Sequence, residues 1–463
     1  MKKFLPHLLF LTACLCGRTA SAQVTVFPDE PTGPVKMMNA TNNCSNEGIF
    51  TKALEIPYVR AHDSMTQSYG TKIVDIRSVF PDFSKDAHAP QSYDFKHTDR
   101  YLQSIINSGS KVYYRLGQSA ESGRNKTGPV PPEDFNKWAV ICEHVVRHYN
   151  EGWANGFHMG IEYWEIWNEP NMDSEKYGLI KNPRNPSFWA GTDEEYYKLY
   201  TVASKHLRKC FPGLKIGGPA FAGSYDQRWI DGFLTAVKKE KAPLDFFSYH
   251  KYATHPGTLI TLTREIRAKL DEHGFKGIEM ILGEWNYVAD WSSDGSEYSS
   301  RVRHGIKGAA FTAAVMSSLQ NEDVQMLQYY DFKKTSIYNG IYDRSSGNPL
   351  PGYYAFLSWA KLRRLGTSLK VETGKLEDIF VTAARAEDGS VGILLTRYNN
   401  DDSIFKRENV EVSVPGRDLS KARCVMTNDA LLFTEYPAPC KDGRMKLNLK
   451  TNCFAYIELP AEQ

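Results

Sequence analysis

The sequence lacks the marks of several large protein classes. It contains no Cys-X-X-Cys pair and no His-Glu-X-X-His motif, so neither a structural zinc site nor a zinc hydrolase is expected. The N-terminal apolar run, residues 8–16, is too short to cross a bilayer. No short repeat is evident along the chain. The sequence therefore predicts neither a metal centre nor a transmembrane segment.

A strong charge of one sign is also missing, since the 463 residues carry a formal net charge of +2. Residues 1–22 have the layout of a secretory signal peptide, with Lys2 and Lys3 before an apolar core and small residues up to Ala22. Removing them also removes Arg18, so the charge becomes +2 minus 3, about −1. No basic patch remains to bind nucleic acid, and an exported protein, periplasmic or extracellular, is predicted.

Cys14 offers an alternative to simple cleavage. Residues 11–14, Leu-Thr-Ala-Cys, resemble a bacterial lipoprotein cleavage site, which would leave a lipid anchor at Cys14 on a membrane surface. We favour cleavage after Ala22. That cut leaves six cysteines, an even number that permits disulfides in an exported chain. At most two of the last three can pair with each other: Cys424, Cys440 and Cys453.

Strand-like and helix-like segments alternate up to about residue 365. Eight apolar runs have the composition of buried strands: residues 35–38, 56–61, 111–116, 161–167, 214–217, 244–249, 278–283 and 324–330. Residues 39–43 are expected to form a polar loop after the first strand. Thr192 and Glu195 make a capping box at the start of one intervening helix. Eight strands with helical spacing predict a (β/α)8 TIM barrel over residues 23–365.

The sequence pattern changes after about residue 365. Short apolar runs then follow at hairpin spacing, separated by Gly, Asp and Asn turns. Residues 366–463 are therefore predicted to form a smaller antiparallel β-sandwich, to which residues 24–27 would add a strand. This domain is interpreted either as a carbohydrate-binding module or, preferably, as a scaffold that covers one side of the barrel.

Two of the apolar runs end in a glutamate with aromatic neighbours. Residues 164–171 read Trp-Glu-Ile-Trp-Asn-Glu-Pro-Asn, and Pro170 ends strand pairing because it has no backbone donor. Glu169 therefore lies at a strand's carboxyl end, the catalytic face of a barrel, where burial can raise a carboxyl pKa and make it a proton donor. Glu284 ends the run at residues 278–286 in the same way. The gap of 115 residues fits three βα units, which places the two glutamates after strands four and seven.

With these motifs in order, the chain resembles glycoside hydrolase family 39. The resemblance rests on Trp-Asn-Glu-Pro-Asn at 167–171, Phe-Trp-Ala-Gly-Thr at 188–192, Tyr-Tyr-Lys-Leu-Tyr at 196–200, Gly-Gly-Pro-Ala at 217–220, Asp-Phe-Phe-Ser-Tyr-His at 245–250 and Gly-Glu-Trp-Asn at 283–286. The family contains β-xylosidases and α-L-iduronidases and belongs to a clan of barrel glycosidases. It implies retaining hydrolysis with Glu169 as acid/base and Glu284 as nucleophile.

The resemblance also suggests residues that bind the substrate. The family uses the amide that corresponds to Asn168 to hydrogen-bond the sugar's 2-hydroxyl, a contact that strengthens in the transition state. Arg60, at the end of the second predicted strand, would hold Glu284 ionised through its charge. It could equally pair with Glu165, which should also point inward.

Four further side chains are candidates for substrate binding. His62 is placed to meet a sugar hydroxyl, and His250 with Tyr252 resembles the family's pair near the nucleophile. Trp285, like Trp167, would either stack on a sugar face or pack inside the barrel wall.

Two places depart from the family's pattern. Arg115 stands near the end of strand three, and Lys333 and Lys334 follow strand eight. A cation in the glycone subsite would read a uronic acid carboxylate. The preferred interpretation of Arg115 is an ion pair with Glu121 or Asp63 at the rim.

These observations predict a secreted, retaining, β-xylosidase-like hydrolase that acts on oligosaccharides or glycosides by double displacement. This mechanism needs no metal or organic cofactor, and it predicts carboxyl groups of Glu169 and Glu284 about 5 Å apart. An α-L-iduronidase-like or other exo-glycosidase is the alternative within the enzyme class. A non-catalytic exported glycan-binding protein on a barrel scaffold is the alternative from another class.

Overall fold

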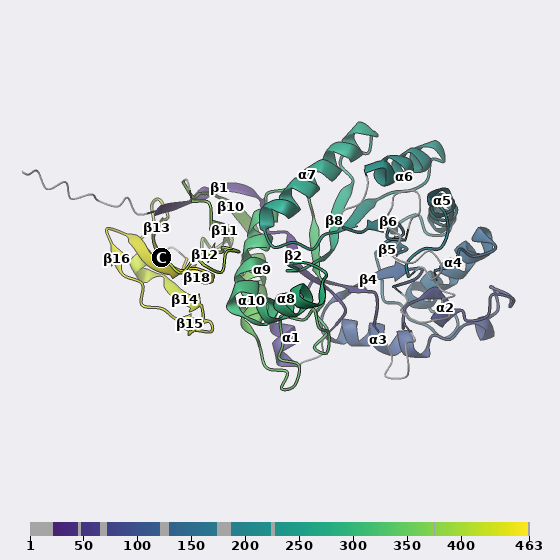
Figure 1. Cartoon of the computed structure of the whole chain (residues 1–463), viewed down its shortest axis with the longest axis horizontal. Coiled ribbons are helices and arrows are strands. Elements are labelled where there is room, and N and C mark those ends of the chain that lie inside the picture. The colour runs from purple at the N-terminus through teal and green to yellow at the C-terminus, as the bar shows by residue number, and fades with distance from the viewer. Residues whose placement is uncertain are drawn as a thin grey trace, which may run out of the picture.

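The computed structural model describes residues 22–461 except 45–47, 65–71, 121–128, 174–186, 224–226 and 375. The predicted signal peptide up to residue 21, with Cys14, and the proposed Arg115 partner Glu121 lie outside these residues. The chain forms a closed barrel with helices around it and, beside it, a sheet built mainly from the C-terminal residues (Figure 1). No helix in the described ranges is long and apolar enough to cross a membrane.

Eight parallel strands close the barrel, which confirms the predicted fold. Pairing between the first and last of them, β2 and β9, completes the ring. Its interior is filled by an aromatic and aliphatic layer, so the barrel is a packed core. The strands are β2 (Met37–Asn42), β3 (Tyr58–Ala61), β4 (Lys111–Leu116), β5 (Tyr163–Ile166), β6 (Lys215–Phe221), β7 (Phe246–His250), β8 (Glu279–Trp285) and β9 (Met326–Tyr329).

The helices bury one face against these strands. The predicted capping box is present at the start of α5, where Thr192 and Glu195 exchange side-chain and backbone hydrogen bonds. The α-helices are α1 (Ile49–Ala53), α2 (Ile76–Val79), α3 (Lys96–Asn107), α4 (Phe135–Glu151), α5 (Asp193–Cys210), α6 (Gln227–Lys239), α7 (Pro256–Glu272), α8 (Ser293–His304), α9 (Ile306–Leu319) and α10 (Pro351–Leu365).

The first barrel strand differs from its prediction. The sequence predicts a strand at residues 35–38 and a loop at 39–43, whereas β2 runs through this polar segment to Asn42. The reason is that its polar side chains find buried partners. The Asn42 amide nitrogen donates to the carbonyl oxygens of Gly283, at 2.7 Å, and Gln328, at 2.9 Å. These bonds satisfy a side chain that would otherwise favour a turn.

The second body is one ten-stranded sheet in the order β15-β14-β18-β12-β11-β10-β1-β13-β17-β16. The N-terminal strand β1 pairs antiparallel with β10 and parallel with β13, so residues 24–27 do join this sheet. Its strands are β1 (Ala22–Pro34), β10 (Thr367–Glu372), β11 (Ile379–Arg385), β12 (Val391–Arg397), β13 (Arg407–Ser413), β14 (Arg423–Thr427), β15 (Thr434–Glu435), β16 (Cys440–Lys441), β17 (Arg444–Lys450) and β18 (Cys453–Leu459).

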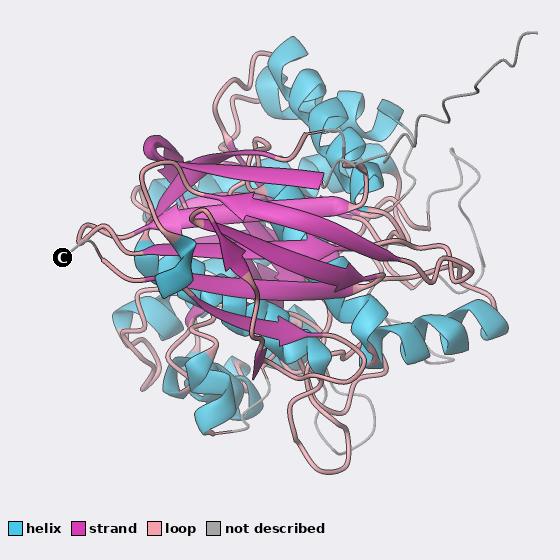
Figure 2. Cartoon of the chain, turned by 90° about the vertical axis from the view of Figure 1, so that its left-hand side faces the viewer, coloured by secondary structure: helices cyan, strands magenta, loops and turns pink. Residues whose placement is uncertain are grey.

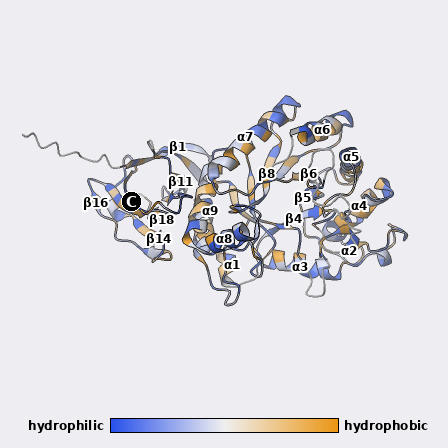
Figure 3. Ribbon diagram, in the orientation of Figure 1, coloured by the Kyte–Doolittle hydropathy of each residue, from blue (hydrophilic) through white to orange (hydrophobic). Residues whose placement is uncertain are grey.

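The sheet lies over one side of the barrel, and Figure 2 shows its strands in front of the helices. Helix α9 lies between the two bodies and packs against β11, β12 and β18. Most of its residues are buried, as expected for a helix covered on all sides, and it is strongly apolar in Figure 3. The sheet thus covers part of the barrel, and its role as a scaffold stays a prediction.

The cysteines of this sheet do not form the disulfide that their number allows. Cys424, Cys440 and Cys453 are free thiols, as are Cys142 and Cys210 in the barrel. The Cys440 and Cys453 sulfurs face the carbonyl oxygens of Leu419 and Lys450 instead, at 3.4 and 3.1 Å.

Candidate active site

Glu169 and Glu284 reach the same end of the barrel from different strands. Glu169 follows β5, the fourth barrel strand, and Glu284 lies near the end of β8, the seventh, so the strand order predicted from spacing is confirmed. The backbone turns sharply before the first of them, with positive φ angles of 76° at Trp167 and 50° at Glu169. Such angles are rare for residues other than glycine and are typical of functional sites. The Glu169 amide nitrogen donates to the Ala220 carbonyl oxygen at 3.0 Å, which holds this turn against β6.

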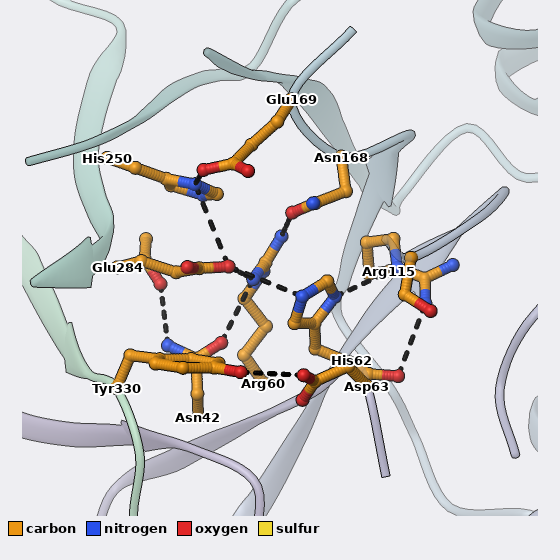
Figure 4. Close-up of polar contacts among 12 residues, drawn as sticks. Asn42, Arg60, His62, Asp63, Arg115, Asn168, Glu169, His250, Glu284 and Tyr330 are labelled. Carbon is orange, nitrogen blue, oxygen red and sulfur yellow. Dashed lines mark hydrogen bonds and ion pairs between the residues drawn. The ribbon is translucent and has the colours of Figure 1, made fainter. Parts of the chain in front are cut away.

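His250, at the end of β7, lies between the two carboxyl groups (Figure 4). Its Nδ1 atom is 2.7 Å from Glu169 Oε1 and 3.7 Å from Glu284 Oε1. One oxygen of each glutamate and one nitrogen of His250 all lie within 4.8 Å of one another. The two carboxyl groups therefore face the same small volume.

Arg60 joins both of its candidate partners at once. The fully buried guanidinium donates from Nε to Glu165 Oε2 at 2.7 Å and from Nη1 to Glu284 Oε1 at 2.8 Å. It also donates from Nη2 to Asn168 Oδ1 at 2.8 Å. Because Arg60 uses the amide oxygen, the Asn168 amide nitrogen is the group left to donate to a ligand. The arginine thus fixes three inward-facing side chains through one rigid fork.

The environment of Glu284 sets its charge. Burial raises the pKa of the Glu284 carboxyl above its ordinary value, and the nearby charge of Glu169 acts in the same direction. His250, Arg60 and a hydrogen bond from Tyr252 lower the pKa and offset part of that rise. The Tyr252 hydroxyl donates to Glu284 Oε2 at 2.7 Å. Both carboxylate oxygens are therefore oriented by protein donors.

The two histidines are neutral and have defined tautomers. Burial and the charges of Arg60 and Arg115 hold the pKa of His62 well below its usual range. Arg115 Nε donates to His62 Nδ1 at 3.3 Å, so the proton lies on Nε2, 3.3 Å from Glu284 Oε1. Burial also lowers the pKa of His250 to about 4.

His250 is held in place by a close approach of the backbone. Its Nε2 atom is buried and has no hydrogen-bond partner among the described residues, so the proton lies on Nδ1, toward the Glu169 carboxylate. A Cβ atom at Gly283 would be only 3.2 Å from that Nε2 atom. Glycine at this position therefore lets the imidazole pack against β8 and point at Glu169.

Comparison with known proteins identifies the family to which the chain belongs. Residues 46–341, more than half of the chain, match the family described as glycosyl hydrolases family 39. The chain belongs to this family. A β-xylosidase from Geobacillus stearothermophilus is 24% identical over 402 residues, which cover 77% of this chain and 71% of that protein.

Solved structures share the fold of this family 39 chain. A glucosidase from Croceicoccus marinus matches with a TM-score of 0.73 at 20% identity and covers 96% of this chain and 100% of that one. A monomeric β-xylosidase from Caulobacter crescentus CB15 matches with a TM-score of 0.69 at 18% identity and the same coverage. Both likenesses extend over the barrel and the sheet together.

The structure brings the predicted residues of the family 39 chain together, with one exception. Arg60, His62, Asn168, His250 and Tyr252 lie around the two glutamates, as described above. Trp285 does not reach the site: its side chain is fully buried against Phe311 of α9 and Tyr329 of β9. The period of a strand gives the reason, because Glu284 points inward and its neighbour must point outward. Trp167 likewise packs against Trp138 and Trp189.

Arg115 has a partner that the sequence did not suggest. Its guanidinium is fully buried and pairs with Asp75, not with Asp63, while another bond reaches the His62 carbonyl oxygen at 3.2 Å. Asp75 also accepts from the Ser119 hydroxyl at 2.9 Å. Arg115 therefore positions His62 from behind and presents no free cation to a ligand.

Replacing Arg115 by methionine is expected to lower the free energy of unfolding by about 3–5 kcal/mol, because Asp75 is left buried without its counter-charge. Denaturant unfolding measures the change. Arg301→Met, which removes an exposed arginine from a helix-surface ion pair, should change stability by less than about 0.5 kcal/mol. Unchanged stability with a raised KM for uronides only would instead assign Arg115 to substrate reading.

Acidic and amide side chains that the sequence analysis did not assign to the substrate site line the wall beside His62. The Asn43 amide nitrogen donates to Asp63 at 2.8 Å and to Asp331 at 3.1 Å, and the Tyr330 hydroxyl donates to Asp63 at 2.6 Å. Burial and the charge of Asp63 raise the pKa of Asp331 to about 7. Their only sequence signal was position, because each follows the end of a barrel strand.

Two groups of described side chains are close enough to share a metal ion. One is Glu169, His250 and Glu284, and the other, between α4 and α5, is Glu143, His206 and Cys210. Both oxygens of Glu284 already accept hydrogen bonds from the protein. A metal-free mechanism stays a prediction.

Proposed function

We propose that this protein is an exported, retaining glycoside hydrolase that releases terminal β-xylose from oligosaccharides or glycosides, with Glu169 as acid/base and Glu284 as nucleophile. The observation that carries the proposal is the closeness of the two carboxyl groups, since one oxygen of Glu169 lies within 4.8 Å of one oxygen of Glu284. Retaining enzymes hold their carboxyl groups about 5–5.5 Å apart, whereas inverting enzymes need about 6.5–9.5 Å for a water molecule. Export rests on the character of residues 1–22.

In the first step, a Glu284 oxygen attacks the anomeric carbon and the bond to the leaving oxygen breaks. Glu169 gives its proton to that oxygen, and a covalent glycosyl-enzyme forms. In the second step, Glu169 takes a proton from water, which attacks the anomeric carbon and releases Glu284. Neutral His250 donates a hydrogen bond from its Nδ1–H to ionised Glu169 in this step and keeps its proton. Arg60 and Tyr252 keep Glu284 oriented and favour its ionised form.

The charges around the site favour a sugar without a carboxylate. The two buried arginines at the site, Arg60 and Arg115, pair with glutamate and aspartate side chains. Asp63 and Asp331 add carboxyl groups on the wall beside His62. A uronic acid would meet these acids, and neither Arg60 nor Arg115 is free to neutralise it. A neutral pyranose such as xylose fits better, in agreement with the β-xylosidases similar to this chain.

A panel of aryl glycosides tests this proposal. We expect turnover of the β-xyloside at least about tenfold faster than that of the α-arabinoside, β-glucoside or β-galactoside, and no turnover of uronides. Incubation with a 2-deoxy-2-fluoro-β-xyloside should leave one fluoroxylosyl group on a peptide that contains Glu284, detected by mass spectrometry. An initial product of inverted anomeric configuration would overturn the retaining mechanism. Binding of glycans without turnover of any glycoside would favour a non-catalytic binding protein.

A further inference from the structure

A large apolar side chain is exposed beside the site. The Trp291 side chain lies in the loop between β8 and α8 and is 60% exposed. Its indole ring is nearly perpendicular to the Tyr252 ring, with centroids 5.3 Å apart and an interplanar angle of 81°. Tyr252 in turn donates to Glu284. A single aromatic ring therefore separates this exposed indole from the carboxylate of the proposed nucleophile.

The loop that carries Trp291 is held on both sides. Asp290 accepts from the Ser292 backbone nitrogen at 2.8 Å, and Ser292 caps α8 by accepting from the Gly295 nitrogen at 3.0 Å. The indole is thus presented by a fixed turn. An exposed tryptophan leaves much of a large aromatic side chain in contact with water, and exposed apolar surface that forms a patch often marks a binding site.

Trp291 and Tyr252 form one end of an aromatic wall, and other rings extend this aromatic wall toward the site. Tyr338 packs against Tyr252 and Tyr330, with centroids 6.3 and 5.2 Å apart. Ile337, next to it in the chain, is 54% exposed, so two of the six large apolar side chains that are exposed in the described ranges belong to this wall. The wall is buried near Glu284 and becomes open and apolar at Trp291.

We propose that Trp291 is a stacking platform for the leaving-group sugar of an oligosaccharide, the ring next to the xylose that is released. This inference rests on the proposed function. In an exo-acting enzyme the released sugar is enclosed between the two glutamates, and the leaving sugar extends toward solvent. A side chain that is 60% exposed therefore meets the leaving sugar and not the enclosed one.

The chemistry of the partner follows from the indole. The axial C–H groups of a pyranose form an apolar face that packs flat on an aromatic ring, while its hydroxyls stay in water. Xylose has no exocyclic hydroxymethyl group, so this face is unobstructed. The platform suits a neutral β-linked xylo-oligosaccharide, because more than half of the Trp291 side chain is exposed.

The experiment compares two substrates that differ in the leaving group. Xylobiose places a sugar on the platform, whereas β-xylosyl fluoride has no leaving sugar. For Trp291→Ala, the ratio of kcat/KM for xylobiose to that for the fluoride should fall about tenfold. Trp291→Phe should restore most of the ratio, because a ring is restored. Phe405→Ala removes another exposed aromatic, 91% exposed in the loop between β12 and β13, and should leave the ratio unchanged.

An unchanged ratio in Trp291→Ala would overturn the platform. An equal loss on both substrates would also overturn it, and would make Trp291 a support for Tyr252. Titration of xylotriose into Glu284→Gln, with and without Trp291→Ala, tests the platform apart from turnover. Weaker binding without Trp291 would support the platform even if the wild type hydrolysed no xyloside. Equal affinity, or no binding at all, would contradict it.

Discussion

Glu284→Gln is expected to lower kcat on an aryl β-xyloside by about 10⁵-fold, because no group remains to form the glycosyl-enzyme. Glutamine keeps one oxygen that can accept from Arg60, and its amide nitrogen can donate to the Tyr252 hydroxyl oxygen, so the fold should be retained. Glu279→Gln makes the same change at the start of the same strand, where the side chain contacts Lys215 away from the site, and should retain activity.

Chemical rescue makes the assignment of Glu284 specific. Glu284→Gly leaves room for azide, which should restore turnover and give xylosyl azide of inverted anomeric configuration. The product anomer is read by NMR. Labelling of another carboxylate by the fluoroxyloside in the wild type would show that Glu284 is not the nucleophile.

The acid limb of the wild-type pH profile follows from the same residue. Glu284 must be ionised to attack, so activity falls as pH decreases through its pKa. Because burial raises that pKa, the limb should lie above the value of about 4.3 for an exposed glutamate. Tyr252→Phe removes a hydrogen bond that lowers the pKa and should shift the limb to higher pH. A limb that does not move in Tyr252→Phe would contradict this account.

Glu169→Gln should lower kcat/KM for xylobiose by about 10³-fold, because the poor leaving group needs a proton. For a dinitrophenyl xyloside the first step needs no proton, so kcat/KM should change little, while kcat falls because water is no longer activated. A burst of dinitrophenol followed by slow turnover is the expected stopped-flow result.

Two comparisons keep the Glu169 prediction open to failure. Glu162→Gln, at an exposed glutamate just before β5, is the matched control and should behave as the wild type. Added azide should accelerate the Glu169 variant on the dinitrophenyl substrate and give xylosyl azide of retained configuration. A uniform loss on both leaving groups would assign Glu169 to binding or structure and not to proton transfer.

The barrel was predictable because each of its strands has a recognisable local sequence pattern. Buried parallel strands need continuous apolar and β-branched runs, and eight such runs occur at βα spacing. The second half of β2 was missed because Asn-rich residues 39–43 favour a turn in isolation. Only the carbonyl oxygens of Gly283 and Gln328, more than 240 residues away in the chain, make Asn42 a strand residue.

The sequence by itself determined the barrel fold and the positions of Glu169 and Glu284 at the ends of the fourth and seventh strands. Both follow from local pattern, namely the strand ends and their order in the chain. The tertiary structure decided which side chains meet. Arg60 contacts Glu165, Asn168 and Glu284 together. Arg115 pairs with Asp75, and the Trp285 side chain is buried in the barrel wall, away from the site. The physical reason is that burying a charged side chain costs free energy of desolvation, which only an oppositely charged or hydrogen-bonding partner offsets. Which partner is within reach depends on how segments distant in the chain pack together.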